Sequence, residues 1–255
     1  MHAFIEHPAG KSLVTESSVP FYDALWTRTK RADQHHKCRM HVIDRLLAAL
    51  PPLDHPRRIL ELGCGSGIVS EFLAAHGEVT GVDQSPVGIE KARSRCQGTF
   101  IVGTLPELSV PGEFDLCVLT QVIEHFNDRD QVRLLQNARR VVRAGGHLIV
   151  TTPNRPVASR VYLRPGEPEP IENWLALDGL QSLLRQTGWE PGTTRFAFSF
   201  LPVLASRYQL ARAARFLMYD VLRLRTMIED LTSPLAVGDC VAVLATARRD
   251  AQPAT

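Results

Sequence analysis

The 255-residue sequence lacks several features that would assign it to a specialised class of protein. It has only five cysteines, scattered and without a C-x-x-C pair, which argues against a disulfide framework or a zinc site. No apolar run is long enough to span a bilayer, and polar residues interrupt the region where a signal peptide would need an apolar core. These absences predict a cytoplasmic protein.

An excess of charge of either sign is also missing. The formal net charge is only +2, so composition gives no indication of nucleic-acid or membrane binding. Internal repeats and low-complexity tracts are absent, and 44% hydrophobic with 22% charged residues is ordinary for a globular protein. We therefore expect no nucleic-acid partner.

The most informative stretch is a glycine-rich turn between an apolar run and a helical pattern. It runs from Glu61 to Gly67, with further glycines at Gly63 and Gly65. Glycine permits positive φ and a close approach to a ligand, and a helix N-terminus presents free backbone N–H groups. The dinucleotide fingerprint G-x-G-x-x-G would need glycine where Ile68 stands. The acid before the turn would repel a pyrophosphate and would suit a ligand that carries an ammonium group.

Strand and helix patterns alternate beyond this turn. Strands are predicted over residues 58–62, 78–82, 99–102, 114–120, 147–151, 195–200 and 239–247. Helices are predicted over 68–75, 86–96, 130–142 and 177–187. The helix over 130–142 is expected to be closed by Gly145-Gly146. The alternation predicts an α/β fold with a seven-stranded, mostly parallel sheet and helices on both faces. We expect a flexible tail over 1–20 and a single domain over 21–250.

Three segments outside the alternation are expected to form a helical cap: 21–50, 153–175 and 200–235. The first carries a basic cluster, which fits either a solvated helix face or a lid that offers a basic group to a carboxylate. An arginine-rich amphipathic helix or helix pair is predicted over 204–231. It fits packing on the sheet edge or a dimer interface, and peripheral membrane contact through 204–225 is the alternative. A monomer or a homodimer is compatible with either.

Candidate site residues follow the ends of predicted strands. Asp83 ends the second strand, where a carboxylate can accept both hydroxyls of a ribose, or can cap a helix. Ligands of open α/β sheets bind beyond the carboxyl ends of the strands, which places Thr120, Gln121, Glu124 and His125 near the site. Histidine is a common general base near neutral pH. The alternative is that Glu124 and His125 anchor the next helix.

Taken together, these motifs resemble a class I S-adenosylmethionine-dependent methyltransferase. The resemblance covers residues 57–155 and rests on Glu61-x-Gly63-x-Gly65-x-Gly67, Asp83, Phe114-Asp115, Ile123-Glu124-His125, residues 143–150 and Thr152-Pro153-Asn154. It implies a Rossmann-like fold, S-adenosylmethionine as cofactor, S-adenosylhomocysteine as product, and no metal. The pattern is most similar to the ubiquinone-biosynthesis-like O-methyltransferases, which implies O-methylation of a small-molecule acceptor.

The same resemblance implies residue roles. Glu61, the backbone of Gly63, Gly65 and Gly67, Thr120 and Gln121 would surround the methionine moiety, with Arg39 on its carboxylate. Asp83 and Gln84 would lie at the ribose, and Thr104 and Leu105 at the adenine. Relatives often carry an acid after the third strand for the adenine amine, and here Thr104 could accept that hydrogen bond. His125 would be the base, positioned by Glu124, with His35, His36 and His41 as alternates.

Three other functions are weighed against this one. A nicotinamide dehydrogenase is disfavoured by the glycine spacing and by Glu61. The segments 121–125 and 151–154 are similar to small-RNA 2′-O-methyltransferases, which hold a metal with two glutamates and two histidines. Gln121 replaces the first glutamate here, and no second histidine follows in the insert after the fifth strand. A non-catalytic cofactor-binding module is the third possibility.

Overall fold

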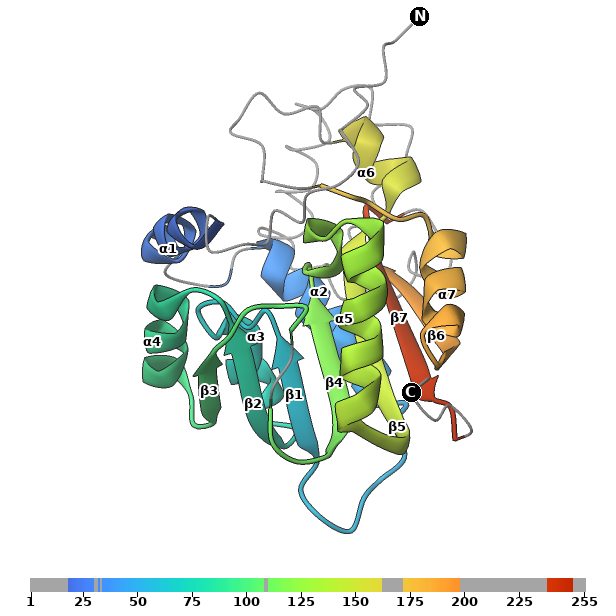
Figure 1. The fold of residues 1–255 in the computed structure, drawn as a ribbon, viewed down its shortest axis with the longest axis horizontal. Helices are drawn as coiled ribbons and strands as arrows, with labels where there is room; N and C mark the ends of the chain where they lie inside the picture. The colour runs from blue at the N-terminus through green and yellow to red at the C-terminus, as the bar shows by residue number, and fades with distance from the viewer. Residues whose placement is uncertain are drawn as a thin grey trace, which may run out of the picture.

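The computed structural model describes residues 18–29, 32, 34–107, 110–161, 172–197 and 238–249. Its helices are α1 (Val19–Arg28), α2 (Gln34–Leu47), α3 (Ile68–Leu73), α4 (Pro86–Arg95), η2 (Ile123–His125, a 3₁₀ turn), α5 (Asp128–Val141), α6 (Arg155–Val161) and α7 (Leu177–Gln186). Its strands are β1 (Arg58–Leu62), β2 (Glu78–Asp83), β3 (Thr99–Val102), β4 (Phe114–Thr120), β5 (Val142–Pro153), β6 (Trp189–Ala197) and β7 (Cys240–Ala247) (Figure 1).

The seven strands form one sheet in the order β3-β2-β1-β4-β5-β7-β6. The pairs among β1 to β5 are parallel, and β7 runs antiparallel to both of its neighbours. The predicted mostly parallel, seven-stranded sheet is confirmed. The chain leaves β1 toward β2 and β3 and returns on the other side as β4. The strand order therefore reverses between β1 and β4, and in open α/β sheets ligands bind in the crevice outside the carboxyl ends of the strands at such a point.

Helices cover both faces of the sheet, as predicted (Figure 1). Because side chains alternate along a strand, Leu60 and Leu62 face one apolar cluster and Ile59 faces another. The first cluster contains Leu134 of α5 and residues of α7, and the second contains residues of α2 and α3. Glu61 shares the face of Ile59, which turns its carboxyl group toward α3.

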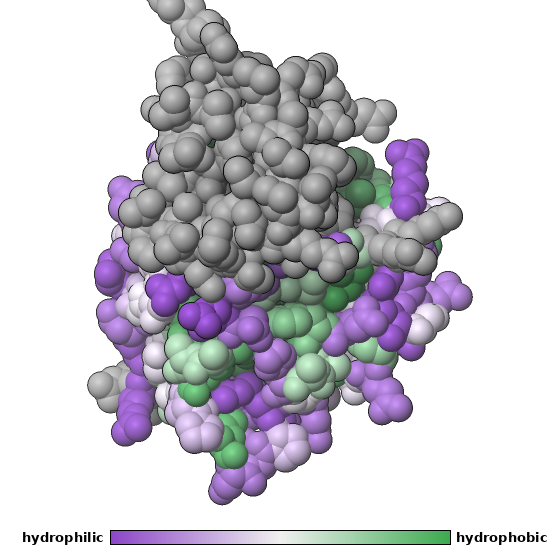
Figure 2. Space-filling view, turned by 180° about the vertical axis from the view of Figure 1, so that it is seen from behind, coloured by the Kyte–Doolittle hydropathy of each residue, from purple (hydrophilic) through white to green (hydrophobic). Residues whose placement is uncertain are grey.

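The outer surface is mainly polar. From behind, hydrophilic side chains cover most of the described surface, with apolar ones in small groups (Figure 2). Among the described residues, Leu25 and Val102 are the exposed large apolar side chains. None of the helices in the described part of the chain has the length and apolar character needed to cross a lipid bilayer.

Two predicted boundaries are wrong. The sixth strand begins at Trp189 rather than at 195, because the register shifts between Pro191 and Thr194 and hides the alternation that marks a strand. Proline is tolerated there because β6 is the edge of the sheet. The fifth strand begins at Val142 rather than at 147, directly after α5 ends, and it contains the two glycines expected to close that helix. A register shift near Phe114 accommodates this early start.

Much of the expected cap lies outside the described residues. Residues 162–171 of the proline-rich segment and the whole of 200–235, with the arginine-rich stretch 204–225, are outside them. Residues 1–17 of the expected tail are outside them as well. The described part of the cap comprises α1, α2, α6 and the segment that leads into α7. The division of the chain into one domain with a cap stays a prediction.

Candidate functional site

The glycine turn after β1 has the backbone that its sequence predicts. Gly63, Gly65 and Gly67 have φ of +75°, +51° and +75°, which L-residues with a Cβ rarely adopt. A Cβ on each would also collide with another element, at 2.4, 2.5 and 2.7 Å from Val122, Trp26 and Ala92, respectively. The loop is therefore packed from three sides, and both its conformation and its neighbours require glycine at these positions.

Glu61 lies directly before this turn and is buried, with 2% of its surface exposed. Ser70 in α3 donates a hydrogen bond from its hydroxyl to Glu61 Oε2 at 2.5 Å. Burial raises the pKa of Glu61 to about 8, the Ser70 hydrogen bond opposes the rise, and the nearby Asp83 adds to it. Near neutral pH the Glu61 carboxyl is therefore largely protonated, and a ligand ammonium group beside it would favour the ionised form.

Replacing Glu61 by glutamine is expected to stabilise the ligand-free protein at pH 8.5 but not at pH 5. The pKa of this carboxyl rises from 4.5 to about 8 on folding, so the folded state holds the proton more tightly. Wild-type stability therefore falls as the pH rises from 4.5 through 8, by up to a few kcal/mol. Thermal unfolding should show a melting temperature about 5 °C or more above wild type at pH 8.5.

Glutamine still accepts the Ser70 hydrogen bond, which makes this variant a test of charge rather than of shape. Glu71→Gln, at a side chain that is 56% exposed, is the control and should show no such pH-dependent gain. An equal melting-temperature difference between Glu61→Gln and wild type at both pH values would contradict the assigned pKa.

Asp83 ends β2 and connects the two loops at the crevice. Its Oδ2 accepts from the backbone N–H of Gly65 at 2.8 Å, and its Oδ1 accepts from that of Ser85 at 2.9 Å. Burial raises the pKa of Asp83, and these two hydrogen bonds oppose the rise. Because each carboxylate oxygen has two lone pairs, the group can accept hydrogen bonds from a ligand beside those from the backbone. The side chain therefore combines the two roles considered from sequence, a turn residue and an acceptor for hydroxyl groups.

Ser85 caps α4 as its sequence predicts. Its hydroxyl accepts from the N–H of Gly88 at 2.9 Å, and Pro86 follows at the first helical position. Beside it, Gln84 Oε1 accepts from the Ser18 hydroxyl at 3.2 Å. Beyond β3, Thr104 is exposed at the same edge of the sheet, while Leu105 is buried in the core cluster. Of these last two, Thr104 is the one whose side chain is open to a ligand.

The carboxyl end of β4 carries an unusual backbone conformation. Gln121 has φ of +56°, which is uncommon for a residue with a side chain. Its N–H donates to Thr151 O at 2.9 Å, and its side-chain amide lies 3.4 Å from Thr151 Oγ1 and 3.5 Å from Cys240 Sγ. The hydroxyl of Thr120 is buried without a hydrogen-bond partner among the described residues. Strain and unpaired polar atoms of this kind concentrate at ligand sites.

Glu124 and His125 lie in η2, directly after this point. Glu124 is buried, its Oε2 accepts from the Thr152 hydroxyl at 3.1 Å, and its carbonyl accepts from the N–H of Asn173 at 2.7 Å. These contacts tie η2 to β5 and to the lead into α7, which favours the anchoring interpretation of Glu124. His125 is half-buried and faces Tyr22 of α1, with the ring centroids 6.2 Å apart.

The sequence of the chain is similar to those of known methyltransferases. Residues 59–146 match a methyltransferase domain family. Over these residues the chain resembles methyltransferase domains. A probable S-adenosylmethionine-dependent methyltransferase of Mycobacterium tuberculosis is 31% identical over 189 residues, or 71% of this chain and 62% of that protein. The ubiquinone biosynthesis O-methyltransferase of Rhizobium rhizogenes is 29% identical over 218 residues, or 69% of this chain and 87% of that enzyme.

The fold of the chain also has solved counterparts. The N-methyltransferase NodS from Bradyrhizobium japonicum, in complex with S-adenosylhomocysteine, matches with a TM-score of 0.60 over 91% of this chain and 97% of that one. At 16% identity, this likeness speaks for the fold alone. The chain spans 62% of the length of its mycobacterial relatives. The resemblance to class I methyltransferases and the Rossmann-like fold are thereby confirmed.

Arg39 and the three histidines considered as alternate bases lie in α2. Arg39 is in α2, and its Nε is buried without a hydrogen-bond partner among the described residues, which leaves a donor for a ligand. His36 and His41 are also in α2 and are half-buried, while the side chain of His35 lies outside the described part. The roles of these four residues stay predictions.

Sequence reasoning missed several residues of the site. In α1, Trp26 contacts the glycine loop and Tyr22 contacts His125. Ser70 of α3 contacts Glu61, and Cys240 of β7 contacts Gln121. One signal was available for Trp26, because the glycine at 88 in the first turn of α4 marks a close approach. The partners of the other three are separated in sequence by distances that no local pattern reports.

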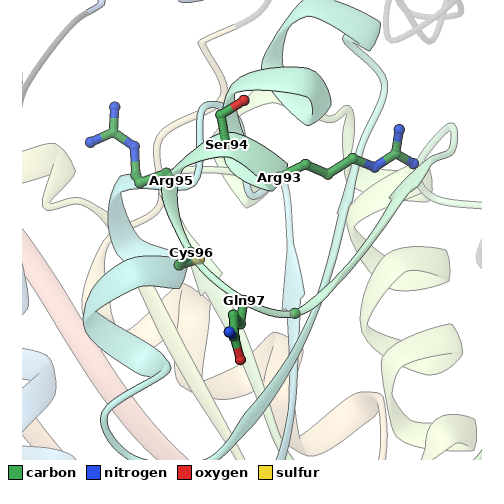
Figure 3. Close-up of a pocket in the computed structure, with 6 residues that line it drawn as sticks. Arg93, Ser94, Arg95, Cys96 and Gln97 are labelled. Atoms are coloured by element: carbon green, nitrogen blue, oxygen red, sulfur yellow. The ribbon is translucent and has the colours of Figure 1, made fainter.

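A separate depression lies at the turn between α4 and β3, lined by Arg93, Ser94, Arg95, Cys96, Gln97 and Gly98 (Figure 3). It is at the amino end of β3, whereas the candidate site is at the carboxyl ends of the strands. Arg93 donates to Phe100 O at 2.6 Å and Arg95 donates to Ser66 O at 2.9 Å. Arg93 therefore supports β3 and Arg95 supports the glycine loop, and we assign the depression no function. Within the described ranges, no group of three or more His, Cys, Asp and Glu side chains is arranged to hold a metal ion.

Proposed function

We propose that this protein transfers the methyl group of S-adenosylmethionine to a hydroxyl oxygen of a small-molecule acceptor and releases S-adenosylhomocysteine. The observation that carries the proposal is the junction of the glycine loop with Asp83, whose carboxylate accepts from the Gly65 N–H and keeps lone pairs for a ligand. The relatedness to a ubiquinone biosynthesis O-methyltransferase supports oxygen as the acceptor atom.

The residues present fit the cofactor. The Gly63–Gly67 loop offers backbone without Cβ atoms, Asp83 suits the ribose hydroxyls, and buried Glu61 suits an ammonium group. Thr120 Oγ1 and Arg39 Nε supply buried polar atoms whose hydrogen-bonding capacity is unused among the described residues. Gln121 would line the methionine side, and Gln84 and Thr104 would lie toward the ribose and the adenine. When bound, the cofactor supplies an electrophilic methyl group on a sulfonium.

The work of the chain is then orientation and proton removal. His125 follows the crevice strand β4, where its imidazole would accept the proton of the acceptor hydroxyl as the oxygen attacks in line. Buried Glu124 holds η2 against β5 through Thr152, which steadies the backbone that carries His125. In this role Glu124 supports the position of the base and does not move a proton itself.

The other functions weighed from sequence have weaker support. A nicotinamide dehydrogenase is disfavoured by the glycine spacing, because Ile68 stands where its fingerprint needs glycine. An RNA 2′-O-methyltransferase with a four-ligand metal site lacks its first glutamate, because Gln121 occupies that position. A non-catalytic cofactor-binding module would not need a histidine such as His125 after β4.

S-adenosylhomocysteine is expected to raise the melting temperature of the protein, whereas NAD(H) is not. Binding to the folded state alone stabilises a protein by an amount that grows with ligand concentration relative to Kd, about 2.7 kcal/mol at a hundredfold excess. Thermal unfolding with each ligand in parallel measures this, and a labelled methyl donor offered to pooled small molecules then searches for the acceptor. Stabilisation by NAD(H) alone would overturn the proposal.

A further inference from the structure

Helix α1 lies above α4, at the end of the sheet where the parallel strands finish (Figure 1). Its aromatic side chains contact two parts of the candidate site. Trp26 packs on Gly65 of the cofactor loop, and Tyr22 packs on His125 after β4. The two aromatic residues are four positions apart in one helix and therefore share a face. One rigid element thus links the loop beneath the cofactor to the proposed base.

The indole of Trp26 occupies a slot that two glycines create. A Cβ at Gly65 would stand 2.5 Å from the Trp26 ring, and a Cβ at Gly88 would stand 2.9 Å from it. Gly88 lies in the first turn of α4, where alanine would favour the helix more than glycine does. The sequence therefore keeps a helix-weakening residue at a point where the indole needs the space. This match of ring and slot indicates that the docked position of α1 belongs to the native fold.

Polar contacts hold α1 in the same position. Lys91 of α4 donates from Nζ to Trp26 O at 2.5 Å and to Thr27 O at 3.0 Å, which satisfies carbonyls at the end of α1. The Ser85 hydroxyl donates to the Asp23 carboxylate. Together with the Ser18–Gln84 hydrogen bond, these contacts tie the helix along its length to the segment that follows Asp83. A side chain on the docked face of α1 is therefore held in place relative to the crevice.

Tyr22 is such a side chain. Its ring centroid lies 6.2 Å from that of His125, and the two ring planes meet at 69°, an edge-to-face arrangement. This geometry is favourable because the positive edge of one aromatic ring meets the negative face of the other. Phe21 packs edge-on against Tyr22 with centroids 5.2 Å apart, which gives the phenol ring a second aromatic contact.

We propose that Tyr22 is a positioning residue for His125. The docked α1 holds the Tyr22 ring against the imidazole and so restricts the orientations from which His125 can accept the acceptor proton. Tyr22 acts through His125 and takes no proton itself. The inference rests on the proposed function, since it assigns His125 as the base. It adds that the orientation of His125 depends on helix α1, which packs on the glycine loop at Gly65.

The test replaces Tyr22 by leucine, which removes the ring and keeps apolar bulk for the docking of α1, and by phenylalanine, which keeps the ring. Histidine-ring carbon–proton spectra are recorded with S-adenosylhomocysteine present, and the His125 resonances are assigned by their loss in His125→Ala. Tyr22→Leu should shift and broaden the His125 resonances, because the ring contact is lost, and Tyr22→Phe should restore them. His76 stacks on Phe72 at 5.1 Å in another part of the fold, so its resonances serve as the internal control and should stay unchanged.

With the acceptor found by the labelled-donor search, Tyr22→Leu should lower kcat about tenfold while KM and the Kd for S-adenosylhomocysteine stay within about twofold. Tyr22→Phe should recover most of kcat. His125 resonances and kcat that remain at wild-type values in Tyr22→Leu would overturn the inference. A different outcome is that the wild-type protein transfers no methyl group while the His125 resonances still respond to Tyr22→Leu. That outcome would overturn the proposed function, and only the contact between the two rings would be established.

Discussion

The His125→Ala variant is expected to transfer methyl groups about 10²–10⁴ times more slowly than wild type, the range typical for loss of a general base. The reason is geometric, since η2 holds His125 directly after β4, at the crevice between β1 and β4. Without the imidazole, the proton of an attacking hydroxyl must pass to water. Single-turnover rates with the labelled donor and the identified acceptor measure the loss of the chemical step itself.

Two comparisons show whether a lower rate of His125→Ala comes from the chemical step rather than from cofactor binding or folding. The affinity of His125→Ala for S-adenosylhomocysteine should stay within about twofold of wild type, because the general base contributes to the chemical step and not to cofactor affinity. His76→Ala is the matched control, since His76 pairs with Asp44 on the outside of the fold at 3.6 Å and should leave the rate unchanged. Undiminished transfer by His125→Ala would remove His125 from the mechanism without refuting methyl transfer.

The Asp83→Asn variant is expected to bind S-adenosylhomocysteine at least about a hundredfold more weakly than wild type. The carboxylate accepts two backbone hydrogen bonds and, in the proposed complex, those of the ribose hydroxyls. An asparagine side chain has only one acceptor oxygen, and its NH₂ group faces either the Gly65 or the Ser85 N–H. Both the ribose contacts and the shape of the loop are therefore lost together. Isothermal titration calorimetry measures the change in Kd.

A loss of binding must be separated from a loss of folding. The thermal unfolding of Asp83→Asn, measured without ligand, shows how much of the variant remains folded at the temperature of the titration. Asp44→Asn carries the same substitution at a side chain that is 51% exposed, so it is the control and should bind normally. An unchanged Kd in folded Asp83→Asn would exclude Asp83 from the cofactor site.

Local sequence determined the scaffold of this site, because its signals act between neighbouring residues. A turn with positive φ favours glycine wherever it lies in the fold, and Gly63, Gly65 and Gly67 all have positive φ. Ser85 before Pro86 caps a helix through contacts within one turn. Alternation of strand and helix patterns placed Asp83 and Thr120 at strand ends, and strand ends of a parallel sheet meet at one edge.

Where the local signal was interrupted, the sequence prediction failed. The Pro191–Gly192 bulge hid the start of β6, and the glycines at 145 and 146 indicated a helix end although they lie within β5. In both places a register shift in the sheet, and not the propensity of the residues themselves, decided the secondary structure. Propensity is a weak guide wherever strand pairing supplies the larger energy.

The sequence by itself determined the fold class, the glycine loop and the acids that flank it, since periodicity and turn chemistry depend on residues close in the chain. Tertiary structure alone decided that Trp26 seats on Gly65, that Tyr22 faces His125, and that Glu124 holds β5 through Thr152. These contacts join separate elements across tens of residues. They depend on how helices pack on the sheet, which no local pattern encodes.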